Sequence, residues 1–287
     1  MTPRSAPSWF GAALAHRPQH AGLVVEDARV HFRTWGTPGD RATVLVHGAG
    51  GHSGWWDHIA PQLGGRVVAV DLTGHGDSGH RTSYDLRQWG REVRAVVEAE
   101  GLDTPAIVGH SMGGRVAVAA ATAGPSRAVV CIDSPVFPVT RERGRRRSPA
   151  RPARVHPSRR DAILRFRPVP DQPVLDYVAA HVADQSVRAV DGGWTWKSDA
   201  GVFGLEPTLR ELLTELDPTT PLAFLRSSAG VVGPDMMEAL LAARQGRVAV
   251  VDLPDTGHHP MLDRPQELVG ALREALAERG PTDRPTI

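Results

Sequence analysis

Ser111 is the residue best placed for nucleophilic chemistry, because it stands at the centre of a Gly-x-Ser-x-Gly pentapeptide, residues 109–113. The pattern by itself is only moderately specific in a chain with 30 glycines. Its setting, between an apolar run typical of a buried strand and an Ala/Val-rich run typical of a helix, makes it far more specific. Gly109 and Gly113 lack the side chains that would collide with the neighbouring strand and helix. We therefore expect Ser111 Oγ to be presented at the carboxyl edge of a sheet as a nucleophile.

A histidine that could act as general base follows the last predicted strand. His258 lies in the segment 253–260, and its position after a strand places it at the same sheet edge as Ser111. The order of serine and histidine along the chain favours the same role. His259 is the alternative, with a structural role as the competing interpretation. Three more histidines, expected to line the pocket or to pack, fall in the surrounding loops: His47, His75 and His110, the last a candidate for substrate contact.

Two backbone N–H groups could stabilise an oxyanion beside Ser111. The helix expected to begin at Met112 directs its N-terminus and its dipole at the site, which makes the Met112 N–H one candidate donor. The other is the Ala49 N–H, in the segment 44–51, where a strand ends in His-Gly and small residues follow. The competing interpretation of that segment is an ordinary glycine-rich turn.

The spacing at which apolar residues recur, together with the glycines that bound each run, predicts the strands and helices that position these residues. Strands are expected at residues 23–26, 28–35, 43–47, 67–71, 106–109, 128–132, 221–226 and 248–253. Helices are expected at residues 84–100, 112–123, 235–243 and 265–278. Alternating strands and helices joined by right-handed crossovers predict a doubly wound α/β fold with a mostly parallel, eight-stranded sheet.

The alternation is interrupted over residues 137–218, where Arg-rich and Pro-rich sequence contains only short helical stretches. We interpret this segment as a helical cap inserted after the sixth strand of a core formed by residues 1–136 and 219–287. Its basic stretch, residues 141–160, contains nine Arg and one Glu. That charge could attract an acidic substrate, but the prolines within it favour a mobile, solvated segment.

Aromatic residues are expected to line an apolar substrate pocket under the cap, although packing within the cap would explain them equally well. The candidates for substrate contact, besides His110, are Trp55, Phe137, Trp194 and Trp196. Phe166, Tyr177 and Phe203 are further candidates within the insertion.

Composition excludes several classes of protein. Of the 287 residues, 41% are hydrophobic and 23% are charged, which excludes a disordered chain, and no apolar run is long enough to span a membrane. With 33 Lys and Arg against 32 Asp and Glu, we expect neither nucleic acid nor a membrane as partner. A single cysteine, Cys131, favours the reducing cytoplasm and predicts no cysteine-rich metal site. The apolar patch near the N-terminus is interrupted, so it is interpreted as an amphipathic lead-in and not as a signal peptide.

In chain order these motifs resemble the α/β-hydrolase superfamily with an inserted cap, and the resemblance covers nearly the whole chain. It rests on residues 47–51 with Trp55 and Trp56, residues 71–78, the nucleophile turn, and Gly257-His258 with residues 263–265. The resemblance implies that Ser111 is the nucleophile, that His258 is the base, and that the Ala49 and Met112 N–H groups form an oxyanion hole. Dehalogenases and epoxide hydrolases of the superfamily carry aspartate at the turn. Serine there points to hydrolysis of an ester, thioester, lactone or carbon–carbon bond.

The acid of the expected triad departs from the usual arrangement of the superfamily. That arrangement places a carboxylate in the turn after the strand 222–226, where this chain reads Arg-Ser-Ser-Ala-Gly. Some members carry the acid after the preceding strand, where this chain has Asp133, and we favour Asp133 as the residue that orients His258. Asp235 and Asp255 are the alternatives, with plainer roles as a helix cap and a turn former.

The residues thus predict a serine hydrolase that needs no cofactor or metal and cleaves a carboxylic ester or lactone through an acyl-enzyme. One alternative is a carbon–carbon bond hydrolase or a cofactor-free oxygen or peroxide enzyme that uses the same triad. Another is a non-catalytic member that only binds a ligand. A small molecule is the expected partner, and the oligomeric state is left open.

Overall fold

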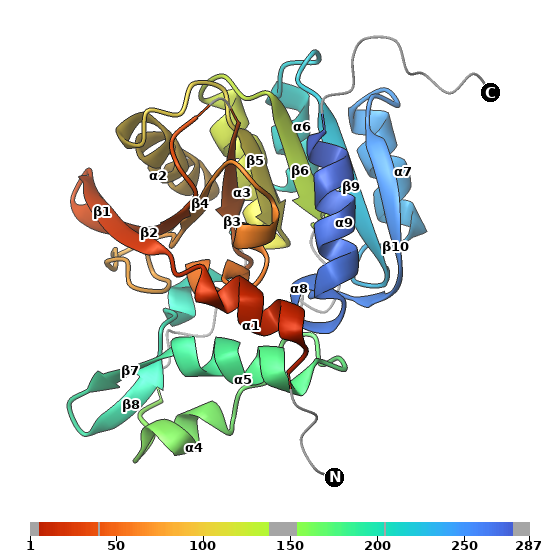
Figure 1. Cartoon of the computed structure of the whole chain (residues 1–287). Coiled ribbons are helices and arrows are strands. Elements are labelled where there is room, and N and C mark those ends of the chain that lie inside the picture. Colours follow the sequence, from red (N-terminus) through yellow and green to blue (C-terminus); the bar gives the residue numbers. More distant parts are fainter. Residues whose placement is uncertain (1–5, 40, 138–153, 204, 278–287) are drawn as a thin grey trace.

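An eight-stranded sheet forms the centre of the molecule, in the order β1-β2-β4-β3-β5-β6-β9-β10 (Figure 1). The computed structural model describes residues 6–39, 41–137, 154–203 and 205–277. The strands of the sheet are β1 (Gln19–Val25), β2 (Ala28–Trp35), β3 (Ala42–Val46), β4 (Arg66–Val70), β5 (Ala106–His110), β6 (Ala128–Ile132), β9 (Leu222–Ala229) and β10 (Ala249–Gly257). β2 pairs antiparallel with β1 and with β4, and every other pairing in this sheet is parallel. The predicted doubly wound, mostly parallel sheet is confirmed.

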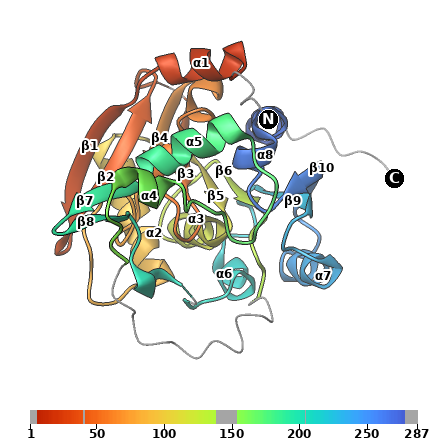
Figure 2. The same ribbon diagram turned by 90° about the horizontal axis from the view of Figure 1, so that it is seen from below.

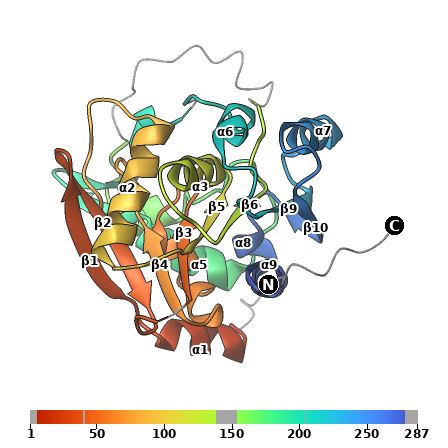
Figure 3. The same cartoon turned by 90° about the horizontal axis from the view of Figure 1, so that it is seen from above.

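The central strands are apolar throughout because both faces of the sheet are covered. Successive side chains of a strand point to opposite faces, so Val44 and Val46 of β3 join one hydrophobic cluster while Leu45 joins the other. Figure 3 shows the first face covered by α2 (Leu86–Ala99), α3 (Met112–Thr122), α6 (Leu209–Glu215) and α7 (Pro234–Ala243). The opposite face is covered by α1 (Ser8–Ala15) and α9 (Pro265–Leu276), and the short α8 (Pro260–Asp263) precedes α9.

Between β6 and β9, the described residues 154–203 form a layer over the carboxyl ends of the central strands. This layer contains α4 (Arg159–Ile163), α5 (Asp176–Gln185), β7 (Val187–Val190), β8 (Gly193–Trp196) and the 3₁₀ turn η3 (Ala200–Val202), and α6 follows it before β9. Figure 2, seen from below, shows α5 crossing the ends of the strands with α4, β7 and β8 beside it. Residues 138–153, and with them most of the predicted basic stretch 141–160, lie outside the described residues.

Two features of this segment differ from the expectation of a helical cap. β7 and β8 form an antiparallel hairpin closed by Asp191 and Gly192, and the φ of 81° at Gly192 suits glycine. The β-branched and aromatic residues of these strands have the β propensity that the hairpin needs. In addition, α6 packs against α3 and α7, so it belongs to the helix layer on one face of the sheet although it falls within residues 137–218.

Two further 3₁₀ turns follow β3, namely η1 (Ser53–Trp56) and η2 (Ala60–Gln62). Within the described part of the chain, no helix combines the length and the apolar character needed to cross a bilayer.

Candidate active site

Ser111 lies in the sharp turn between β5 and α3, with a φ of 54° and a ψ of −120°. A side chain on Gly109 would overlap the backbone of Gly113, and one on Gly113 would overlap the backbone of His47. The two glycines therefore permit the strained turn, as the pentapeptide predicts. The Ser111 N–H donates to the Ile132 carbonyl over 2.9 Å, which anchors the turn to β6.

His258 connects Ser111 to Asp133. Nε2 of His258 lies 3.0 Å from Ser111 Oγ, and Nδ1 lies 2.7 Å from Oδ2 of Asp133. Because a carboxylate only accepts, Nδ1 of His258 carries the proton and Nε2 presents a lone pair to the serine hydroxyl. The arrangement has the geometry of a nucleophile, a base and an orienting acid.

Asp133 is fully buried directly after β6, with a φ of 41°. Its Oδ2 also accepts the Val231 N–H over 2.9 Å, from the loop after β9. A Cβ on Gly230 would overlap the carboxylate of Asp133. Gly230 stands in the turn where the superfamily usually places its acid, so the missing side chain leaves the space that the Asp133 carboxylate occupies.

The other two carboxylates considered from the sequence lie in different surroundings. Asp235 is in the first turn of α7, and Asp255 is a residue of β10 with a φ of 51°. β10 continues past the expected end at residue 253, with an irregular register between Leu253 and Gly257, so His258 directly follows the strand. Among the described residues, Asp133 is the carboxylate that holds Nδ1 of His258.

The loop after β3 is held by hydrogen bonds of His47 and by a turn in which the Gly51 N–H donates to the Gly48 carbonyl. Nδ1 of His47 donates to the Gly48 carbonyl over 2.8 Å, while its Nε2 accepts the Leu72 N–H over 3.2 Å. In the described part of the chain, neither the Ala49 N–H nor the Met112 N–H has a hydrogen-bond acceptor. An oxyanion hole requires backbone N–H groups without an acceptor, so the assignment of these two groups stays a prediction.

A series of aromatic rings leads from the insertion to His258. Trp196 lies 6.1 Å from Phe166, Phe166 lies 6.0 Å from Trp55, and Trp55 lies 5.5 Å from His259, measured between ring centroids. His259 in turn lies 4.7 Å from His258. Two of the expected substrate contacts, Trp55 and Trp196, therefore belong to one apolar array.

The remaining aromatic candidates lie elsewhere. The Trp194 ring carries the Arg159 guanidinium at 5.8 Å, and Phe137 packs against the core at the start of the insertion. Tyr177 packs against Phe10 of α1, with 4.9 Å between ring centroids. Phe203 is 54% exposed, and its ring lies beside Gly50 in the loop after β3.

The loop that carries His258 is braced by residues that sequence reasoning missed. Oε1 of Gln172 accepts the His259 N–H over 2.9 Å, and Nε2 of Gln172 donates to Asp263 over 3.0 Å. Asp263 also accepts the Gly257 N–H over 2.6 Å. Asp263 belongs to a motif of the resemblance, but Gln172 has no local signal because its partners are 87 and 91 positions away.

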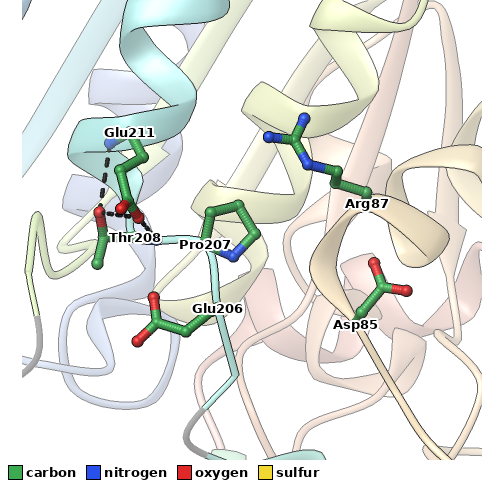
Figure 4. Close-up of a pocket in the computed structure, with 6 residues that line it drawn as sticks. All are labelled: Asp85, Arg87, Glu206, Pro207, Thr208 and Glu211. Atoms are coloured by element: carbon green, nitrogen blue, oxygen red, sulfur yellow. Dashed lines mark hydrogen bonds between the residues drawn. The ribbon is translucent and has the colours of Figure 1, made fainter.

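A separate surface groove is lined by Asp85, Arg87, Glu206, Pro207, Thr208 and Glu211 (Figure 4). Most of its polar groups belong to helix ends or to an ion pair. Asp85 caps α2, Thr208 and Glu211 form the capping box of α6, and Arg87 pairs with Glu215. The groove contains no residue of the candidate site.

Residues 43–271 match the Alpha/beta hydrolase family, so the chain belongs to this family. It is 25% identical to an esterase from Mycobacterium tuberculosis over 93% of this chain and 96% of that protein. The solved structure of that esterase has a TM-score of 0.75 at 21% identity, over 96% of this chain and 99% of the other.

Two relatives match over a shorter stretch. A serine hydrolase-like protein from Danio rerio is 39% identical over 30% of this chain, and the match spans only 28% of its own length. A 2-hydroxy-6-oxononadienedioate/2-hydroxy-6-oxononatrienedioate hydrolase from Dechloromonas aromatica is 36% identical over 35% of this chain and 37% of that protein.

Proposed function

We propose that this α/β hydrolase cleaves carboxylic esters, lactones included, through an acyl-enzyme intermediate. The observation that carries the proposal is the hydrogen-bonded series from Ser111 through His258 to Asp133, with distances of 3.0 and 2.7 Å. The similarity to a mycobacterial esterase over almost the whole of both chains supports an ester as the bond that is cleaved.

Acylation begins when Ser111 Oγ attacks the ester carbonyl carbon and its proton passes to Nε2 of His258. Asp133 keeps the Nδ1 proton in place and stabilises the imidazolium that forms. The negative charge that develops on the carbonyl oxygen is stabilised by the Ala49 and Met112 N–H groups. His258 then donates its proton to the leaving alkoxide, which stays attached to the acyl group if the substrate is a lactone.

Deacylation repeats these steps with water as the nucleophile. His258 accepts a proton from water as the water attacks the acyl carbon. The bond from the acyl carbon to Ser111 Oγ then breaks, His258 returns the proton to Oγ, and the carboxylic acid leaves. The rings of Trp55, Phe166 and Trp196 form an apolar array that reaches His259 beside the site, which favours a substrate with an apolar acyl or alcohol part.

The test combines kinetics with covalent labelling of the full chain. A p-nitrophenyl ester should give a burst of nitrophenol equal to one equivalent of enzyme wherever deacylation is slower than acylation. A fluorophosphonate probe should phosphonylate Ser111 with loss of fluoride, and so add the mass of its phosphonyl group to the peptide that contains Ser111. Ser111→Ala should remove the label and lower kcat by about 10⁴ to 10⁶. Ser83→Ala, a change of an exposed serine, should alter neither readout.

The second candidate function is hydrolysis of a carbon–carbon bond, which the Dechloromonas relative favours. Comparison of kcat/KM for nitrophenyl esters with that for a 2-hydroxy-6-oxo-dienoic acid separates the two. Preference for the dienoic acid by tenfold or more contradicts the ester proposal. Failure of the probe to label Ser111, together with absence of turnover on either substrate, would favour a ligand-binding member.

A further inference from the structure

Three histidines meet beside the nucleophile. His110, at the end of β5, lies against His258 and His259, and the ring centroids are 4.7 to 5.1 Å apart. All three side chains are buried, and one ring nitrogen from each lies within 4.8 Å of the other two. The sequence places each of these histidines near the expected site but does not predict that their rings meet, because about 150 positions separate His110 from the other two residues.

Each imidazole donates one N–H to a fixed acceptor. Nδ1 of His258 donates to Asp133 over 2.7 Å. Nε2 of His110 donates to the His258 carbonyl over 2.7 Å, and Nε2 of His259 donates to the Val169 carbonyl over 3.1 Å. These acceptors fix the tautomers, because a neutral imidazole has one N–H and one lone pair. The lone pairs therefore remain on Nε2 of His258 and on Nδ1 of His110 and His259.

The free nitrogens are suited to a metal ion. Nδ1 of His259 is buried without a hydrogen-bond partner, which is a costly state for a polar atom. Histidine ligands of metals commonly donate their second ring N–H to a carboxylate or a backbone carbonyl. All three histidines follow that pattern.

We propose that His110, His258 and His259 form a binding site for a divalent transition-metal ion that prefers imidazole ligands, with Zn²⁺ as the probe. Three imidazoles are a common ligand set for this ion, with bonds of about 2.0 to 2.1 Å that place the nitrogens about 3.4 Å apart in a tetrahedral site. One ring nitrogen of each histidine lies within 4.8 Å of the other two, so the rings must move closer together to bind the ion. A fourth position is left for water or for Ser111 Oγ.

The bound ion inhibits hydrolysis, and this part of the inference rests on the proposed function. The metal occupies the lone pair of Nε2 of His258, so that His258 no longer accepts the Ser111 proton. Removal of the ion by a chelator restores the lone pair, and the inhibition is reversible. The bound ion thus prevents activation of the Ser111 nucleophile, and the ion itself takes no part in the reaction.

Calorimetric titration of the full chain with ZnCl₂ tests binding without any need for activity. Wild type and Ser111→Ala should each bind one Zn²⁺ per chain. His259→Phe keeps a ring in the cluster but removes its lone pair, and should weaken binding at least about tenfold. His16→Phe, a change of an exposed histidine outside the cluster, should bind as wild type does. Absence of Zn²⁺ binding by Ser111→Ala below 1 mM, or equal binding by His259→Phe and wild type, overturns the site.

Inhibition is measured separately, with the rate of each variant compared with its own zinc-free rate. Zn²⁺ should inhibit wild type and His16→Phe at the same concentration, and His259→Phe should need at least about tenfold more. Zn²⁺ that binds without lowering the rate contradicts the proposal that the bound ion inhibits hydrolysis.

If the chain hydrolyses no ester, the proposed function fails while the calorimetry still decides the metal site. If His259→Phe does not fold, wild type is titrated with Co²⁺, and a visible spectrum of octahedral rather than four-coordinate cobalt overturns the site.

Discussion

Asp133 is the residue whose role is least visible in its local sequence, and it is the easiest to test alone. Asp133→Asn keeps the shape of the side chain, but an amide N–H in place of an oxygen favours the wrong tautomer of His258. We expect kcat to fall by about 10⁴. The measurement is kcat on a nitrophenyl ester, with Asp235→Asn as the matched control, expected to stay within about twofold because Asp235 lies in the first turn of α7. A loss below tenfold for Asp133→Asn would contradict its assignment, as would a hundredfold loss for Asp235→Asn or Asp255→Asn.

A substitution of Gly230 tests the position of the same carboxylate without changing Asp133 itself. In Gly230→Ala the new methyl group overlaps the carboxylate of Asp133, which must move away from Nδ1 of His258. We expect kcat to fall at least tenfold and the free energy of unfolding to fall by about 1 to 3 kcal/mol. Gly270→Ala is the control, because no atom lies within 4 Å of the added Cβ in α9, and it should raise stability by about 0.5 to 1 kcal/mol. Equal kcat for Gly230→Ala and wild type would show that the Asp133 carboxylate tolerates displacement.

At the scale of elements, helix α5 is attached to the core through a buried ion pair. Both oxygens of Asp57 accept from Nη1 of Arg33 over 2.9 Å, and Nε2 of His181, on α5, lies 2.9 Å from Oδ2. Burial by itself raises the pKa of the Asp57 carboxyl, but His181 and Arg33 together bring that pKa below its ordinary value. The contribution to stability is therefore present above the pKa of the unfolded chain and is lost as the pH falls through the folded value.

Asp57→Asn should lower the free energy of unfolding by about 3 kcal/mol, because it leaves Arg33 buried without a countercharge. The control is Asp184→Asn, also in α5, which removes an ion pair with Arg159 of α4. Both side chains of that pair are more than 40% exposed, so its loss should lower the free energy of unfolding by at most about 1 kcal/mol. Urea denaturation of the two variants at pH 7.5 gives the comparison. Equal losses for both variants would mean that the buried pair does not attach α5 to the core.

At the scale of the whole molecule, buried neutral histidines predict sensitivity to acid. Burial lowers the pKa of His52 to about 3 and that of His58 to about 4, from an ordinary value of 6.5. Between pH 6.5 and pH 4 the unfolded chain therefore binds more protons than the folded chain, and stability falls as the pH falls. At pH 5 the loss from His58 alone is about 2 kcal/mol.

Urea denaturation at pH 7.5, 6 and 5 checks this expectation. The free energy of unfolding should decrease by several kcal/mol over that range. In His58→Gln the decrease between pH 7.5 and pH 5 should be about 2 kcal/mol smaller than in wild type. His16→Gln, at an exposed position, should leave the decrease unchanged. A free energy of unfolding that does not vary between pH 7.5 and pH 5 would contradict the prediction.

The features that the sequence determined by itself depend on neighbouring residues. The turn around Ser111 follows from two glycines within five residues, and the order of strands and helices follows from the period of apolar residues. These signals are local because backbone angles and the burial of one face depend on adjacent positions. The doubly wound sheet and the place of Ser111 at its edge could therefore be predicted.

Only the tertiary structure decided which distant groups meet. Asp133 and His258 are 125 positions apart, and their contact depends on the order of β6, β9 and β10 in the sheet and on the missing side chain of Gly230. The three-histidine cluster and the bracing by Gln172 are equally non-local. The side chains that share a space are set by strand order and register, which the whole core determines, and no short stretch of sequence contains that information.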